Sequence, residues 1–251
     1  MRNDNICLIM PSLNEAPNLR WVLPQIENKY RVIVVDNRST DDTKIVAAKH
    51  NVEYVYCREA GYGNAVLAGI GHLQRSKKTE PDVIVIFDAD GTSPASAIPA
   101  VASPIVDGEK DFVIGQRTFK QKGAMPFHAD FGNRLTVFLM HLLTGYKYQE
   151  MGPLRALRYQ SLLKLDMIDR TWGWNVEMQM KAVWQKLRIT EVRIEYLRRR
   201  HGRSKISGSL IGSVRAGSKI LSRIAYFYIQ YKWSRALSSS RITSESKVHP
   251  L

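Results

Sequence analysis

A short apolar run near the middle of the chain ends in two acidic residues. Residues 82–87 read DVIVIF, and Asp88-Ala89-Asp90-Gly91 follows directly. The run is rich in β-branched residues and too short for a helix, which is typical of a buried strand that surfaces at its carboxyl end. Because side chains alternate along an extended chain, Asp88 and Asp90 can point the same way. Adjacent carboxylates repel each other unless a cation lies between them, so we expect Mg²⁺ or Mn²⁺ bound together with phosphate; two solvated carboxylates are the alternative.

The charge of the chain requires an anionic partner. It carries 37 basic and 23 acidic residues among 251, a net charge of +14. The partner can be nucleic acid, anionic lipid or a phosphorylated substrate. The two cysteines, Cys7 and Cys57, are not spaced as metal ligands, which favours a reducing compartment. No apolar run approaches the roughly 18 to 20 residues that span a bilayer, so we expect a cytoplasmic protein that meets a membrane only peripherally, at the cytoplasmic face.

Strand-like runs alternate with helical stretches through the first half of the chain. The strands that we predict before residues 82–87 are Ile6–Met10, Arg31–Val35 and Val52–Tyr56. This alternation predicts crossover connections and a largely parallel sheet. Ligands of such sheets bind beyond the carboxyl ends of the strands. The residues at or just after these ends are Pro11, Asp36, Gly61 and Asp88.

Two of these strand ends suit a nucleotide. Asp36 can accept hydrogen bonds from a ribose or a base, and Gly61 and Gly63 permit a ligand to approach the backbone closely. Each also has a plainer interpretation as a turn residue. A Gly-x-Gly pair that follows the third strand and lacks the third glycine is a weak dinucleotide signal, so we discount a dehydrogenase.

Three motifs occur in order along this half: PSLNE at residues 11–15, VVDNRSTDDT at 34–43, and DAD at 88–90. Together they resemble the nucleotide-sugar half of the inverting family 2 glycosyltransferases. The resemblance implies the GT-A fold, a Rossmann-like α/β fold with a mostly parallel central sheet. It also implies a nucleotide-sugar donor and a divalent cation, Mg²⁺ or Mn²⁺, on Asp88 and Asp90. The residues that we assign to the nucleotide sugar are Pro11, Asn14, Glu15, Asp36, Asn37, Gly63, Asp88 and Ala89. Asn37 departs from the family, which often has a second Asp there.

Further motifs follow in the second half: GQR at residues 115–117, EMGPLR at 150–155, TWGWNVE at 171–177 and RRRHGRSK at 198–205. Their order resembles the polyprenyl-phosphate sugar transferases, the branch that includes the dolichol-phosphate mannose and glucose synthases. The resemblance covers about residues 5–210 and implies a polyprenyl-phosphate acceptor. The residues that it assigns to the acceptor phosphate are Arg117, Arg134, Arg203, Ser204 and Lys205. The candidate catalytic residues are Asp90, Arg117, Lys205 and Glu177, the last where many family 2 enzymes place a general base. Glu150 stands where this branch commonly has Asp.

The chemistry of the basic run agrees with a phosphate site, because closely packed cations invite an anion and Arg binds phosphate in a bidentate manner. Other functions stay open: a GT-A enzyme with a soluble small-molecule acceptor, a nucleotidyltransferase on a similar sheet, and a basic nucleic-acid-binding module. Asp88 and Asp90 argue against nucleic acid, since unmetallated carboxylates repel a phosphate backbone. The expected partners are therefore a nucleotide sugar, a polyprenyl phosphate and an anionic membrane surface. A homo-oligomer is left open.

We expect one domain over residues 1–237. Its nucleotide-sugar half reaches about residue 117, its acceptor half covers about 118–208, and helices follow at about 209–237. Residues 220–233 mix aromatic with basic side chains, a composition that suits docking at a membrane interface; an aromatic helix is, however, more often packed on the core or on another subunit. Residues 238–251, rich in Ser and charge, are expected to be disordered.

Overall fold

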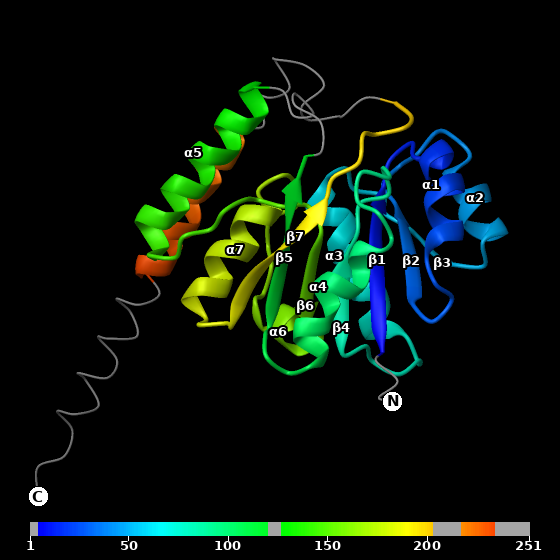
Figure 1. The fold of residues 1–251 in the computed structure, drawn as a ribbon, viewed down its shortest axis with the longest axis horizontal. Coiled ribbons are helices and arrows are strands. Elements are labelled where there is room, and N and C mark those ends of the chain that lie inside the picture. Colours follow the sequence, from blue (N-terminus) through cyan, green and yellow to red (C-terminus); the bar gives the residue numbers. More distant parts are fainter. Residues whose placement is uncertain (1–4, 120–126, 203–216, 234–251) are drawn as a thin grey trace, which may run out of the picture.

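Seven strands form a sheet in the order β3-β2-β1-β4-β6-β5-β7, with helices on both faces (Figure 1). The computed structural model describes residues 5–119, 127–202 and 217–233. The strands are β1 Ile6–Ser12, β2 Arg31–Asp36, β3 Glu53–Tyr56, β4 Val83–Ile86, β5 Phe112–Thr118, β6 Arg155–Arg158 and β7 Ile189–Glu195. The helices are α1 Ala16–Val22, α2 Thr43–Lys49, α3 Tyr62–Arg75, α4 Ala97–Val106, α5 Phe127–Thr144, α6 Tyr159–Lys164 and α7 Trp174–Trp184, with a 3₁₀ turn at Leu23–Gln25.

The sheet is mostly parallel, as predicted. Strand β1 pairs in parallel with β2 and β4, β2 with β3, and β5 with β7. Strand β6 runs antiparallel between β4 and β5. The four strands predicted for the first half are confirmed to within two residues at their ends. The mostly parallel α/β class is confirmed, while the division at about residue 117 stays a prediction.

Alternating side chains of β1 supply two separate cores. Cys7 and Ile9 face the layer formed by α3, α6 and α7, whereas Leu8 and Met10 face α1 and α4. All four are fully buried. Burial on both faces explains why the strand is a continuous apolar run. The rigid sheet fixes the strand ends that carry the site.

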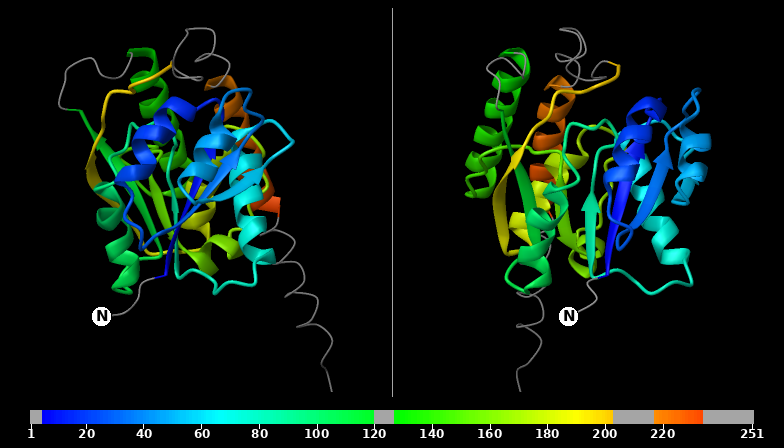
Figure 2. Two further views of the ribbon diagram at one scale, coloured as in Figure 1. Left: turned by 90° about the vertical axis from the view of Figure 1, so that its right-hand side faces the viewer. Right: turned by 45° about the vertical axis from the view of Figure 1, so that its right-hand side comes forward.

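A helix over residues 217–233 stands beside α5, at the end of the molecule opposite α2 (Figure 2). Its inner face carries Ile224 and Phe227, which are buried. The ring of Tyr231 stacks on Trp184 of α7, with centroids 4.2 Å apart. The helix predicted for this region is confirmed there, while residues 209–216 and the predicted disordered tail at 238–251 lie outside the described residues. No helix in the described part of the chain is both long and apolar enough to cross a membrane.

Candidate active site

The carboxylates of Asp88 and Asp90 follow β4 at the carboxyl edge of the sheet, uppermost in Figure 1. Ala89 between them is buried, whereas both acidic residues are partly exposed, and the charge of Asp90 acts on Asp88. Tyr62 donates a 3.2 Å hydrogen bond to Oδ1 of Asp88. Burial, and then the charge of Asp90, raise the pKa of Asp88 to about 7. A cation bound between the two carboxylates would offset this repulsion.

Asp90 uses one of its two carboxylate oxygens to hold the turn that follows it. Oδ1 accepts hydrogen bonds from the amide of Thr92 at 3.0 Å and from its hydroxyl at 2.7 Å. Oδ2 faces the Nη1 atom of Arg199 at 3.1 Å. This second oxygen is therefore the one directed at other charged groups.

Asp36, at the end of β2, is buried and fixed at both oxygens. Oδ1 accepts the amide of Ser39 and Oδ2 accepts the hydroxyl of Tyr54, each at 2.7 Å. Burial and the hydrogen bond to Asp36 raise the pKa of Tyr54. The carboxylate is thus preorganised, and each oxygen keeps a lone pair for a further donor such as a ribose hydroxyl.

The departure from the family at Asn37 has a structural explanation. Its Nδ2 donates to the carbonyl of Glu59 at 2.6 Å, and its Oδ1 accepts the amide of Gly61 at 2.9 Å. A carboxylate accepts but does not donate, so Asp would lose the first of these bonds. Asn37 therefore ties the end of β2 to the loop that opens α3.

The residues of the first motif line the neighbouring strand end. Pro11 pairs with Val35 near the end of β1. Asn14, with a positive φ of 52°, accepts the amide of Thr40 at 2.7 Å. Glu15 is buried, accepts Nδ2 of Asn18 at 2.6 Å, and pairs with Arg199. Arg199 thereby brings the ends of β1 and β4 together.

The two glycines at the start of α3 pack against the loop before α7. A Cβ on Gly61 or Gly63 would lie 2.2 Å from the carbonyl oxygen of Arg170 or Asp169, respectively. The amide of Gly63 points to the carbonyl of Thr171 at 3.3 Å. The close approach that we expected from a ligand is thus made by this loop, and binding of the nucleotide by Gly63 stays a prediction.

Arg117 is the acceptor-phosphate candidate that the structure fixes most firmly. Glu150 accepts its backbone amide at 2.7 Å and also its guanidinium. The guanidinium lies over the ring of Tyr196, 5.2 Å from the centroid. Glu150 therefore orients Arg117. An Asp at this position has a shorter side chain and would reach the guanidinium less easily.

Glu177 is fully buried in α7 and has little capacity left for substrate. It accepts the amides of Ile168 at 2.8 Å and Asp169 at 2.7 Å, and Lys181 lies 2.7 Å away. These contacts favour a role in holding the loop over the general-base role that the resemblance implied.

The remaining predicted residues lie apart or outside the described ranges. Arg134 is exposed on α5 and forms an ion pair with Asp130 one turn earlier, at 2.9 Å. Arg203, Ser204 and Lys205 lie outside the described residues. Among the residues that the structure describes, no contact links Arg134 to the carboxylates.

Sequence reasoning did not single out three residues near this site. Arg199 belongs to the basic run, in which we predicted that Arg203 and Lys205 bind the anion. Tyr62 was predicted only to lie at the start of a helix. Arg155 is fully buried on β6, and burial lowers its pKa to about 10; no pattern in the sequence distinguishes it from a surface Arg.

A family model described as "Glycosyl transferase family 2" matches residues 7–165, which include both carboxylate strand ends. The chain belongs to glycosyl transferase family 2. It is therefore a glycosyltransferase, as the sequence predicted. Membership excludes the reading of the chain as a basic binding module without enzymatic activity.

Two relatives are similar to this chain over most of its length. An uncharacterized glycosyltransferase of Mycobacterium tuberculosis is 34% identical over 214 residues, which cover 85% of this chain and 95% of the relative. The UDP-N-acetylglucosamine–dolichyl-phosphate N-acetylglucosaminyltransferase of Methanococcus voltae is 27% identical over 243 residues, covering 84% and 93%.

Among solved structures, glucosyl-3-phosphoglycerate synthase from Mycobacterium tuberculosis matches with a TM-score of 0.69 at 19% identity, covering 88% of this chain and 80% of that one. That structure is a complex with Mn²⁺, UDP-glucose and phosphoglyceric acid. The likeness confirms the GT-A fold predicted for this family 2 enzyme.

Proposed function

We propose that this enzyme transfers a sugar, with inversion, from a nucleotide sugar to a polyprenyl phosphate at the cytoplasmic face of a membrane. One observation carries the choice of acceptor. Ten large apolar side chains are exposed in the described part of the chain, and seven of them lie on α5 and the helix at 217–233. These seven are Phe131, Phe138, Leu142, Leu221, Tyr226, Ile229 and Trp233. We call them the apolar face.

The apolar face has the geometry of an interfacial surface. Phe131, Phe138 and Leu142 are seven and four residues apart, which places them on one stripe of α5. The neighbouring helix adds Trp233, whose exposed fraction is 71%, and basic residues such as Lys219 and Lys232. Aromatic side chains flanked by cations favour the boundary between headgroups and acyl chains.

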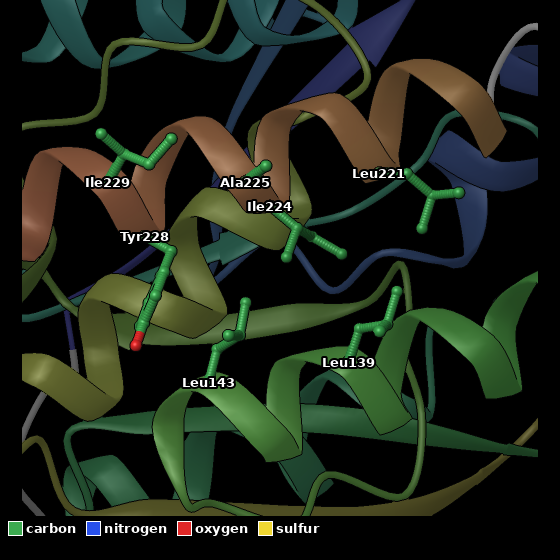
Figure 3. A pocket seen from close by; sticks show the side chains of 7 residues that line it. All are labelled: Leu139, Leu143, Leu221, Ile224, Ala225, Tyr228 and Ile229. Atoms are coloured by element: carbon green, nitrogen blue, oxygen red, sulfur yellow. The ribbon is translucent and has the colours of Figure 1, made fainter.

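A pocket of about 480 Å³ opens between these two helices (Figure 3). Ile224 and Tyr228 point from the C-terminal helix toward Leu139 and Leu143 of α5. The other lining residues, Leu221, Ala225 and Ile229, are also apolar. An apolar recess next to an apolar face supports an acceptor that carries a lipid chain.

The donor side rests on the two strand-end carboxylates. Among the described residues no group of three or more His, Cys, Asp and Glu could hold a metal by itself. A pair of carboxylates that shares a cation with substrate phosphates is the usual magnesium arrangement, and the charge of Asp90 contributes to the raised pKa of Asp88. Asp88 and Asp90 would hold Mg²⁺ or Mn²⁺, the two ions present in the solved complexes of the synthase with UDP. The ion supplies Lewis-acid stabilisation of the departing diphosphate.

The remaining residues bind and orient. Asp36, with Pro11, Asn14, Glu15, Asn37 and Ala89 around it, would receive the nucleoside. A phosphate monoester has a second pKa near 6, so the acceptor is already mostly dianionic and needs positioning more than deprotonation. Arg117, held by Glu150, would orient that phosphate together with Arg203, Ser204 and Lys205, with Arg134 as a further candidate. Glu177 would then act by holding the loop before α7.

A second candidate is transfer to a soluble phosphorylated acceptor. The solved synthase structures favour it, because they include complexes with phosphoglyceric acid. The same Arg117 chemistry would bind such a phosphate, and the apolar face would then be buried against another copy.

The test is a donor screen with two acceptors. Purified protein with Mn²⁺ or Mg²⁺ receives UDP- and GDP-sugars, and release of nucleoside diphosphate is followed with a short polyprenyl phosphate, with phosphoglycerate, or with neither. Release that depends on polyprenyl phosphate supports the proposal and names the donor. Release that depends only on phosphoglycerate would replace the proposal by the second candidate.

The apolar face is tested separately by vesicle sedimentation. We expect Phe138→Ser combined with Leu142→Ser to lower binding to anionic vesicles at least fivefold. Ile45→Ser is the matched control, since Ile45 is 54% exposed on α2 at the other end of the molecule. Equal binding by both variants would contradict docking through this face.

A further inference from the structure

Arg199 lies where a cation would be expected to bind. Its Nη1 is 3.1 Å from Oδ2 of Asp90, and its Nη2 contacts Oε1 of Glu15. The side chains of Arg199, Asp90 and Glu15 are only 16%, 21% and 7% exposed. An ion pair so poorly exposed to water is screened less than one on the surface.

The segment that carries Arg199 is fastened across the strand ends. The amide of Leu197 donates to the carbonyl of Thr92 at 2.7 Å. The amide of His201 donates to Oδ1 of Asn18 at 3.2 Å. The guanidinium of Arg200 lies over the ring of Trp21, 4.1 Å from its centroid. Contacts on both sides thus keep Arg199 aimed at the carboxylates.

We propose that Arg199 is the counter-ion of the metal-free carboxylate site and leaves Asp90 when a divalent cation binds. The inference rests on the metal site of the proposed function. Oδ1 of Asp90 is already engaged twice by Thr92, so Oδ2 is the oxygen that remains for an incoming ion. Arg199 holds that oxygen, and the two cations therefore compete for it.

The competition has a chemical use. Without metal, Glu15, Asp88 and Asp90 place three acidic groups together, and Arg199 neutralises part of that charge. A nucleoside diphosphate that arrives with its metal brings new anionic oxygens beside the released guanidinium. Arg199 then pairs with phosphate oxygens in place of the carboxylates. Its charge is therefore paired both without the metal and with the metal and nucleoside diphosphate bound.

The test measures binding of Mn²⁺ alone, by loss of the free-ion signal in electron paramagnetic resonance. We expect Arg199→Ala and Arg199→Gln to bind Mn²⁺ about tenfold more tightly than the wild type, because a charge-assisted contact no longer competes. Arg198→Ala is the matched control, since it removes the same charge from an exposed position of the same segment. Its affinity should stay within twofold of the wild type. Adding Asp90→Asn to Arg199→Gln should remove the gain.

Unchanged or weaker Mn²⁺ binding in both Arg199 variants would overturn the proposal and leave the proposed function standing. Absence of Mn²⁺ binding in every protein, with or without UDP or GDP, would instead overturn the metal site on which both depend. Circular dichroism confirms that the compared proteins are folded.

Discussion

Arg155 donates a 3.1 Å hydrogen bond from Nη2 to Oε1 of Gln179, and neither residue exposes any surface. Its Nε and Nη1 donate to the carbonyls of Gly152 at 2.8 Å and Asn175 at 3.0 Å. One buried guanidinium thus joins β6 to α7 and to the loop that carries Glu150 and Gly152. The arrangement links the acceptor side of the site to the core of the sheet.

Replacing this guanidinium should cost much of the stability of the protein. Arg155→Met removes three hydrogen bonds and the positive charge of a fully buried guanidinium, so we expect the free energy of unfolding to fall by about 3–5 kcal/mol. Arg158→Met, at the partly exposed end of the same strand, should cost about 1 kcal/mol. Urea titration of both variants measures the difference. Equal losses in the two variants would show that the buried hydrogen bonds of Arg155 contribute no more to stability than the contacts of Arg158.

Glu150 should matter for the acceptor and not for the donor. In Glu150→Gln the guanidinium of Arg117 loses its charged partner and its fixed direction. We expect KM for the acceptor to rise about tenfold, with KM for the nucleotide sugar within twofold. Glu109→Gln, an exposed change near the other end of β5, is the control. Equal effects on both KM values would contradict this division.

A variant of Glu177 distinguishes a structural role of this carboxylate from a catalytic one. In Glu177→Gln one amide hydrogen-bond acceptor becomes a donor that faces the N–H of Ile168 or Asp169. We expect the free energy of unfolding to fall by about 2 kcal/mol and kcat to stay within about tenfold. Thermal unfolding and steady-state kinetics on the same preparation measure both. A thousandfold loss of kcat at unchanged stability would identify a general base instead.

A pH-dependent part of the stability resides at Glu53 of the edge strand β3. Burial alone would raise the pKa of Glu53, but hydrogen bonds from Arg31, Lys78 and His72 outweigh it and lower the pKa to about 2. In the unfolded chain the pKa of a Glu side chain is near 4.3. The folded state therefore favours the ionised form of Glu53 more strongly than the unfolded chain does. The stabilisation is present above about pH 4.3 and is lost as the pH falls toward 2.

We expect Glu53→Gln to lower the free energy of unfolding by about 2–3 kcal/mol at pH 7, with the difference shrinking between about pH 4.3 and 2. The exposed Glu27, which pairs with Lys29, provides the control variant Glu27→Gln, expected to change stability by less than about 0.5 kcal/mol. A difference that does not depend on pH would contradict the assignment.

Local periodicity predicted the strands and the acidic residues at their ends, because burial on both faces leaves a continuous apolar run that stops at Asp36 or Asp88. Local periodicity could not predict which group packs against a glycine. Gly63 packs against the carbonyl of Asp169, which is distant in sequence. Arg155 and Arg199 were missed for a related reason. A charged residue at a strand end or in a basic run is usually solvated, and only tertiary packing selects which one turns inward.

The central claim is that the carboxylates after β4 hold the cation that binds the diphosphate of the donor. Turnover of Asp90→Asn tests this claim most directly. Asn keeps an oxygen that can accept the bonds of Thr92, so the turn and the fold should persist, while the charge is lost. The account predicts a loss of at least about a thousandfold in acceptor-dependent release of nucleoside diphosphate, at an unchanged circular dichroism spectrum. A folded variant that keeps more than a tenth of wild-type turnover would contradict it.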